Sequence, residues 1–262
     1  PTVYESLAAS GTTAINATLV TWENFQQTLG YIVDWQDIFR ERSAQIIQVM
    51  SVDDILKAKQ DGKVGVILGW QNSTPIENDL RRIELFRSLG VLIMQLTFHE
   101  RNFIGNGCLE RGDAGLSNFG IDAVHEMNRM GILIDLSHCG ERTTLNAIEM
   151  SSKPVACTHA NAQSFHMHPR NKTDEALKLL AERGGVVGAT AFNMFLPGGR
   201  DPGADYCHLA LQALVIGFEK PAMSHIDRAR SKVVVQRAVQ RRGASVSDAV
   251  AVTRGESVKP HF

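Results

Sequence analysis

Short apolar runs of strand length alternate with stretches of helical periodicity through the first 200 residues of the chain. Successive runs recur at intervals of about 25 to 40 residues, the spacing that parallel strands joined by helices require. The pattern predicts six strands, at residues 12–20, 64–69, 91–97, 132–136, 154–158 and 185–192.

Apolar side chains at helical spacing fill the intervals between these runs. Ser117 is a suitable N-cap and Gly131 a suitable C-cap for a helix between the third and fourth strands. The periodicity predicts helices at about residues 22–48, around 80–86, at about 117–131, from about 141 onward and at about 173–183.

The nearly continuous apolar character of the strands indicates a sheet covered on both faces, which favours a parallel barrel or a doubly wound sheet. No G-x-G-x-x-G sequence follows the first strand, so a dinucleotide-binding sheet is disfavoured. We therefore predict an α/β fold of the (β/α)8 TIM-barrel type, incomplete, with about six recognisable βα units. We expect residues 1–217 to form this partial barrel domain and residues 218–262 to form an irregular tail.

Polar side chains able to bind a metal follow three of the predicted strands. His138 ends the sequence GILIDLSH, His159 ends KPVACTH, and Gln71 ends VGVILGWQ. Active sites of parallel barrels lie at the carboxyl ends of the strands. Neutral imidazole is a preferred ligand of zinc, and a catalytic zinc site keeps one position open for water. The two histidines are therefore candidate metal ligands, with a structural role for each as the alternative.

Charge and composition narrow the range of partners. A formal net charge of -1 provides no field that would attract nucleic acid, so we expect a small-molecule substrate. No apolar run is long enough to span a bilayer, the start of the sequence lacks the pattern of a signal peptide, and a cytoplasmic location is expected. The four cysteines form no C-x-x-C pair, which indicates neither a zinc knuckle nor a disulfide framework.

The elements DLSH, THAN and HPRNKTDE, set in a long central stretch, resemble the membrane dipeptidase family of zinc dipeptidases. The similarity covers about residues 10 to 200. It implies a (β/α)8 barrel that binds two metal ions bridged by a glutamate. It also implies that His138 and His159 bind one of the ions and that Arg170 holds the substrate carboxylate. A guanidinium suits that task because it offers a bidentate fork to a carboxylate.

Several positions depart from the family pattern. Gln71 stands where the resemblance places the bridging glutamate, and a neutral amide is a poor bridge between two dications. No histidine occurs in residues 1–40, so the His-x-Asp pair expected on the first strand is absent. Phe98 takes the place of a further family histidine, with His99 on the opposite face if the strand continues. The family's Gly-Ser/Thr-Asp segment has no counterpart after residue 220. A sequence lacking its ends explains these departures, and so does a variant that has lost dinuclear catalysis.

The sequence thus predicts metal-dependent hydrolysis of dipeptides, with one or two zinc ions and weakened binding of the second. The alternative is a catalytically inactive dipeptide-binding or scaffold protein of the same fold. Other hydrolytic reactions, of lactams or esters, are compatible with the same fold. The resemblance also implies a homodimer.

Overall fold

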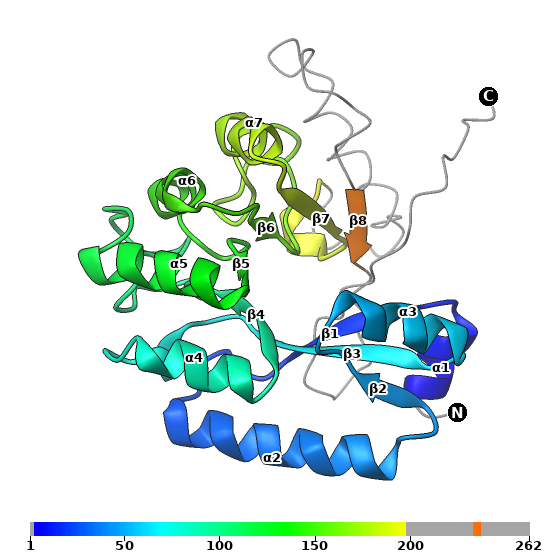
Figure 1. The fold of residues 1–262 in the computed structure, drawn as a ribbon. Helices are drawn as coiled ribbons and strands as arrows, with labels where there is room; N and C mark the ends of the chain where they lie inside the picture. The colour runs from blue at the N-terminus through cyan, green and yellow to red at the C-terminus, as the bar shows by residue number, and fades with distance from the viewer. Residues whose placement is uncertain (1–2, 198–232, 237–262) are drawn as a thin grey trace, which may run out of the picture.

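The computed structural model describes residues 3–197 and the backbone of residues 233–236. Within this part of the chain, eight parallel strands form one curved sheet, and the helices alternate with them (Figure 1). The strands are β1 (Ala14–Thr18), β2 (Ile46–Gln48), β3 (Val64–Trp70), β4 (Val91–Gln95), β5 (Leu133–Asp135), β6 (Ala156–Cys157), β7 (Val186–Thr190) and β8 (Val233–Gln236). Their order is β1-β3-β4-β5-β6-β7-β8, and β2 also pairs with β3.

The longest strand, β3, organises one end of the sheet. One edge of β3 pairs with β1 over residues 65–69. The other edge pairs with β2 over residues 64–66 and then with β4 over residues 68–70, with a register shift after Leu68. From β4 to β7 each strand pairs with the next along the chain, as in a (β/α)8 barrel. The sheet is therefore part of a TIM-barrel-like wall.

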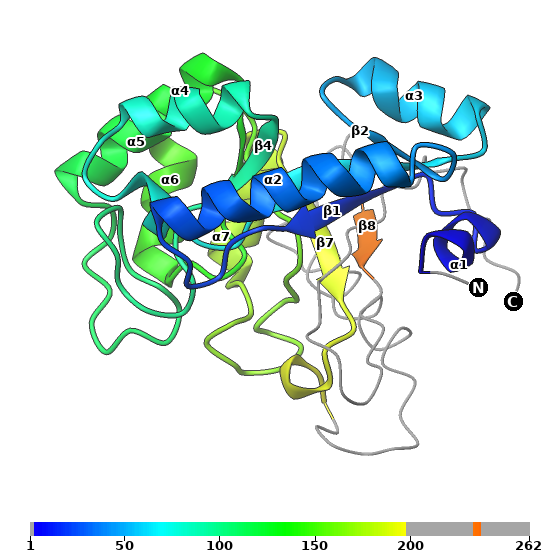
Figure 2. The same cartoon turned by 90° about the horizontal axis from the view of Figure 1, so that it is seen from below.

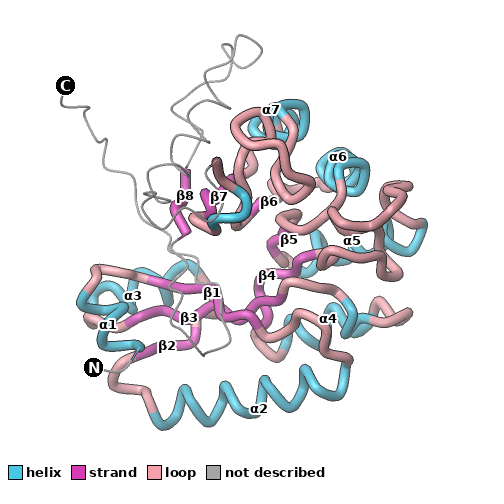
Figure 3. The backbone as a smooth tube through the Cα atoms, turned by 180° about the vertical axis from the view of Figure 1, so that it is seen from behind, coloured by secondary structure: helices cyan, strands magenta, loops and turns pink. Residues whose placement is uncertain are grey.

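Helices cover the outer side of this wall. Figures 2 and 3 show the strands in the middle of the molecule and the long helices around them. The α-helices are α1 (Val3–Ala9), α2 (Phe25–Glu41), α3 (Val52–Gln60), α4 (Arg81–Ser88), α5 (Asn118–Met130), α6 (Glu141–Met150) and α7 (Asp174–Glu182), and two 3-10 turns occupy Thr74–Ile76 and Asn193–Phe195. No helix in these residues is long and apolar enough to cross a bilayer.

Side chains at the helix ends explain where several helices start and stop. Asn24 and Ser51 form capping boxes at α2 and α3, and Ser117 and Thr173 accept backbone N–H bonds at α5 and α7. Gly131 ends α5 in the left-handed region with φ 69°, a conformation that glycine adopts without steric cost. These caps satisfy backbone groups that a helix end leaves without partners.

The core lies between the sheet and the helices. Trp70 on β3 is 1% exposed, and its ring packs edge-on against Phe86 of α4 at a centroid distance of 5.0 Å. Aromatic pairs with this geometry add to the stability gained from burial. The packing fixes α4 against the strand whose end carries Gln71.

The structure confirms all six strands expected from the sequence and corrects one helix. The predicted helix at 22–48 is wrong at its end, because α2 stops at Glu41 and Ile46–Gln48 form β2. The backbone described at 233–236 forms β8, inside the segment expected to be an irregular tail. The predicted domain boundary at residue 217 lies outside the described residues.

Candidate active site at the carboxyl ends of β5 and β6

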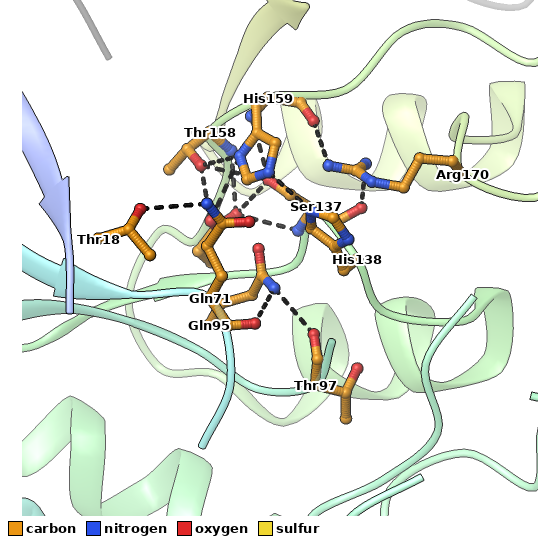
Figure 4. Close-up of polar contacts among 10 residues, drawn as sticks. Thr18, Gln71, Gln95, Thr97, Ser137, His138, Thr158, His159 and Arg170 are labelled. Atoms are coloured by element: carbon orange, nitrogen blue, oxygen red, sulfur yellow. Dashed lines mark hydrogen bonds and ion pairs between the residues drawn. The ribbon is translucent and has the colours of Figure 1, made fainter. Parts of the chain in front are cut away.

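The structure brings His138 and His159 together. Their Nε2 atoms lie 2.8 Å apart, and both side chains are buried (Figure 4). His138 follows β5 by three residues and His159 follows β6 by two residues, so adjacent strands deliver the two rings to one place. The convergence expected from the two strand ends is present.

Asp135, the last residue of β5, joins the two loops that carry the histidines. Its Oδ1 accepts hydrogen bonds from the backbone N–H groups of Ser137 and Thr158, both at 3.0 Å, and also from the Ser137 hydroxyl. Its Oδ2 accepts a bond from the Thr158 hydroxyl at 2.6 Å. The Ser137 hydroxyl in turn accepts from the backbone N–H of His159 at 3.0 Å. A carboxylate that is 1% exposed therefore holds both loops through several polar groups.

The same network sets the proton positions on His159. The Thr158 hydroxyl has one proton, which it donates to Asp135. The contact of 2.8 Å between Thr158 Oγ1 and His159 Nδ1 is then a bond donated by Nδ1–H. His159 Nε2 keeps its lone pair and accepts from the Nε2–H of His138. One imidazole of the pair thus already presents the unprotonated nitrogen that a metal requires.

Two buried cations lie behind the histidines. Arg170 is 0% exposed and Lys172 is 2% exposed. Burial, followed by the charge of Arg170, lowers the pKa of His138 and of His159 well below the usual value of 6.5. Both rings are therefore neutral at pH 7, the form in which imidazole binds metals.

The predicted role of Arg170 in binding a carboxylate stays a prediction. Its guanidinium donates from Nη1 to the carbonyl of Ser137 and from Nη2 to the carbonyl of His159, the latter at 2.6 Å. These acceptors belong to the two loops that carry the histidines. The guanidinium in this arrangement contacts the backbone of the site.

The loop after β4 adds two more rings to the site. Phe98 stacks on His138 at a centroid distance of 4.3 Å, and the His99 ring meets the edge of His138 at 4.5 Å. The sequence placed these neighbours on opposite faces of a continuing strand. The strand instead ends at Gln95, and His99 has φ 60°, which turns its ring towards His138. Burial, followed by the charge of Arg170, lowers the pKa of His99 to about 4.

Gln71 directly follows β3, and its backbone and side chain have separate partners. Its side-chain amide donates to the Thr18 hydroxyl of β1 at 3.1 Å, and its carbonyl accepts from the amide of Gln95. Figure 4 shows the Gln71 amide on the same side of the strands as the two imidazoles. A metal role for Gln71 stays a prediction, since only its carbonyl-type oxygen could serve as a ligand.

The donor set fits part of a zinc site. Two imidazole nitrogens on one tetrahedral zinc lie about 3.3 Å apart, given Zn–N bonds of about 2.05 Å. The observed 2.8 Å lies about 0.5 Å from that value. His138 would carry its proton on Nδ1, a buried atom without a hydrogen-bond partner in the described structure. Within residues 3–197, no group of three or more His, Cys, Asp or Glu side chains is arranged to hold a metal ion. The described residues thus supply two ligands for one cation and fall short of a complete dinuclear site.

Fold and site together define a TIM-barrel-like α/β protein with a polar site at the carboxyl ends of its strands. A profile of the family described as "Membrane dipeptidase (Peptidase family M19)" matches residues 5–253. The chain belongs to this family of peptidases.

Individual relatives are consistent with that assignment. An uncharacterized dipeptidase, C965.12, from Schizosaccharomyces pombe is 34% identical over 158 residues, which are 58% of this chain and 37% of that protein. The chain therefore spans little more than a third of this curated relative. The crystal structure of an amidohydrolase from Pseudomonas aeruginosa is 37% identical, with a TM-score of 0.82 over 93% of this chain and 71% of that one.

A more distant structure supports the fold alone. It is a metallo peptidase from Rhodobacter sphaeroides liganded with a phosphinate mimic of the dipeptide L-Ala-D-Ala, and it is 24% identical to this chain. The TM-score is 0.69 over 76% of this chain and 58% of that one.

Sequence reasoning missed the residues that support the histidines. Asp135, Ser137 and Thr158 lie within three residues of the two candidates, in DLSH and THAN. Asp135 interrupts the apolar run at 132–136 one position before its end, which is costly unless the carboxylate is bonded inside the protein. A carboxylate placed within an apolar strand therefore could have indicated that Asp135 supports the site.

Proposed function

We propose that this chain hydrolyses dipeptides by metal-dependent chemistry at the carboxyl ends of β5 and β6. The proposal rests chiefly on one observation, the convergence of His138 Nε2 and His159 Nε2 to 2.8 Å. Membership of a dipeptidase family supports the type of reaction and the class of substrate. When bound there, a zinc ion would polarise the peptide carbonyl and lower the pKa of a water molecule.

The residues of the chain prepare the site for that chemistry. The Asp135 and Thr158 pair fixes the His159 ring through Nδ1, which leaves Nε2 directed at the ligand position. Arg170 and Lys172 place two positive charges behind the imidazoles, and their field favours a substrate that carries a terminal carboxylate. Phe98 covers one face of His138 and limits the access of water to that ring.

Hydrolysis of a dipeptide panel tests this proposal. The panel includes peptides with a D-residue at the carboxyl end, assayed with the full chain and added zinc. We expect turnover that falls by at least about 100-fold in His138→Gln and in His159→Gln, since each removes an imidazole ligand. His125→Gln, the same replacement on the exposed surface of α5, serves as the control. Absence of zinc-dependent turnover in the unaltered chain would retire the proposal.

A second candidate function is binding of dipeptides without hydrolysis. Gln71 favours it, because an amide replaces the charged bridge, as does the lack of a three-ligand group in residues 3–197. Calorimetric binding of dipeptides by the zinc-treated chain, with no product after prolonged incubation, would support this function over catalysis.

A further inference from the structure

The HPRNK segment, residues 168–172, carries two buried cationic side chains that contact the loops of the two histidines. Arg170 and Lys172 lie in this segment and are both almost fully buried. The segment is docked by backbone bonds on each side, from Lys172 N to Asn161 O at 2.8 Å and from Gln163 N to Lys172 O at 2.7 Å. The two cationic side chains therefore extend from a fixed base.

Three consecutive backbone carbonyls after β5 each accept a hydrogen bond from outside their own loop. Ser137 O accepts from the Arg170 guanidinium, His138 O accepts from Cys108 N at 2.8 Å, and Cys139 O accepts from Lys172 Nζ at 2.8 Å. The first two carbonyls belong to the peptide planes on either side of the His138 Cα atom. Holding both planes fixes the backbone dihedrals of His138 and so the direction of its side chain.

The other end of the guanidinium reaches the second histidine. Arg170 Nη2 donates to His159 O at 2.6 Å, while the backbone N–H of His159 is bonded to the Ser137 hydroxyl at 3.0 Å. The two nitrogens of Arg170 belong to one rigid, planar group. One guanidinium therefore sets the separation of the peptide planes next to both imidazoles. A lysine ammonium is a single point and cannot span the two carbonyls with the same fixed geometry.

We infer that Arg170 is a positioning residue that holds His138 and His159 at the separation a cation requires, and that Lys172 supports it at the His138 loop only. This inference rests on the proposed metal-dependent function and adds the residues that keep its two ligands in place. It differs from a direct clamp on the substrate carboxylate. The Lys172 ammonium contacts Cys139 O and the Thr144 hydroxyl, and neither contact involves the His159 loop.

The test compares Arg170→Lys and Lys172→Arg, which both keep the positive charge, with Arg81→Lys, an arginine replacement on the exposed surface of α4, in the full chain. Side-chain ¹⁵N spectra of the histidines report the imidazole positions without any metal. We expect Arg170→Lys to shift the signals of both His138 and His159, Lys172→Arg to shift those of His138 alone, and Arg81→Lys to shift neither. Unaltered imidazole signals in a folded Arg170→Lys protein would overturn the inference. If Arg170→Lys does not fold, a shift of His159 as large as that of His138 in Lys172→Arg would overturn it.

Cobalt binding and kinetics separate this inference from the carboxylate clamp and from the proposed function. Positioning predicts that Arg170→Lys weakens cobalt binding by about 10-fold or more. It also predicts the same relative loss of kcat/KM for a dipeptide and for its carboxyl-terminal amide. A rise in KM restricted to the free dipeptide, with unchanged cobalt affinity, would instead establish the clamp. If the unaltered chain binds no cobalt, the proposed function fails, and the histidine spectra still decide the positioning role.

Discussion

Replacement of Asp135 by asparagine is expected to reverse the proton arrangement of His159. The change keeps the size of the side chain and the oxygen that accepts from Ser137 and Thr158 backbone N–H groups. The amide nitrogen, however, takes the place of Oδ2 and faces the Thr158 hydroxyl at 2.6 Å. That hydroxyl must then accept from the amide and direct its own proton to His159 Nδ1. His159 consequently carries its proton on Nε2, the nitrogen proposed to bind metal, and His138, whose Nε2 then accepts this bond, carries its proton on Nδ1.

The loss of stability follows from the bonds that Asp135 makes. Four hydrogen bonds to a charged oxygen become bonds to a neutral amide, which weakens each by about 1 kcal/mol and the set by about 4 kcal/mol. Removing a buried charge recovers roughly 2 kcal/mol of its desolvation cost. We therefore expect the Asp135→Asn protein to be less stable by about 2 kcal/mol.

Two measurements check this prediction. Long-range ¹H–¹⁵N spectra of the histidine side chains distinguish a protonated from an unprotonated Nε2, and urea denaturation gives the free energy of unfolding. Asp122→Asn, on the exposed surface of α5, is the matched control and should change neither quantity. An Asp135→Asn protein in which His159 Nε2 stays unprotonated would refute the assigned hydrogen-bond directions. Unchanged stability would refute the role of Asp135 in joining the two loops.

Three further predictions concern the neighbourhood of the site. A Cβ atom at Gly107 would lie 2.1 Å from the carbonyl carbon of His99, so Gly107→Ala should destabilise the chain by about 2 kcal/mol in urea denaturation, and unchanged stability would contradict this close approach. Because the pKa of His138 and of His159 is lowered in the folded state, the unfolded chain alone takes up these protons below pH 6.5. The contribution of the two neutral rings to the free energy of unfolding is therefore complete above pH 6.5. It is lost as the pH falls, by up to about 1.4 kcal/mol per pH unit for each ring. Replacement of both histidines by glutamine should reduce this pH dependence of stability between pH 6.5 and 5, as measured by urea denaturation. Gln71→Glu should raise the zinc content measured by elemental analysis, since a carboxylate adds a charged ligand, and no gain would count against the position assigned to residue 71.

The fold was largely predictable because its strands are apolar runs bounded by polar turns. The strands β3 and β4 were predictable as continuous apolar runs, since both are buried on the two faces of the sheet. β2 was missed because its three residues follow α2 closely and two of them are isoleucines, which also suit a buried helix face. Only the pairing of residues 46–48 with residues 64–66 distinguishes the two conformations.

The site was predictable only as far as strand ends determine it. Parallel pairing of β5 with β6 delivers His138 and His159 to one edge, which the sequence order already implies. The turn of His99 towards His138 depends on its left-handed backbone and on the absence of a side chain at Gly107. The bonds of Arg170 to two backbone carbonyls depend on tertiary packing, which the hydrophobic periodicity of the sequence does not reveal.

Zinc titration of the full chain measures whether His138 and His159 bind a metal ion. We predict that the unaltered protein binds one zinc ion through the imidazoles 2.8 Å apart, and that His138→Gln and His159→Gln each abolish this binding while the fold is retained. Zinc binding that is unchanged in both variants would contradict a metal site at the ends of β5 and β6, as would no binding by the unaltered chain.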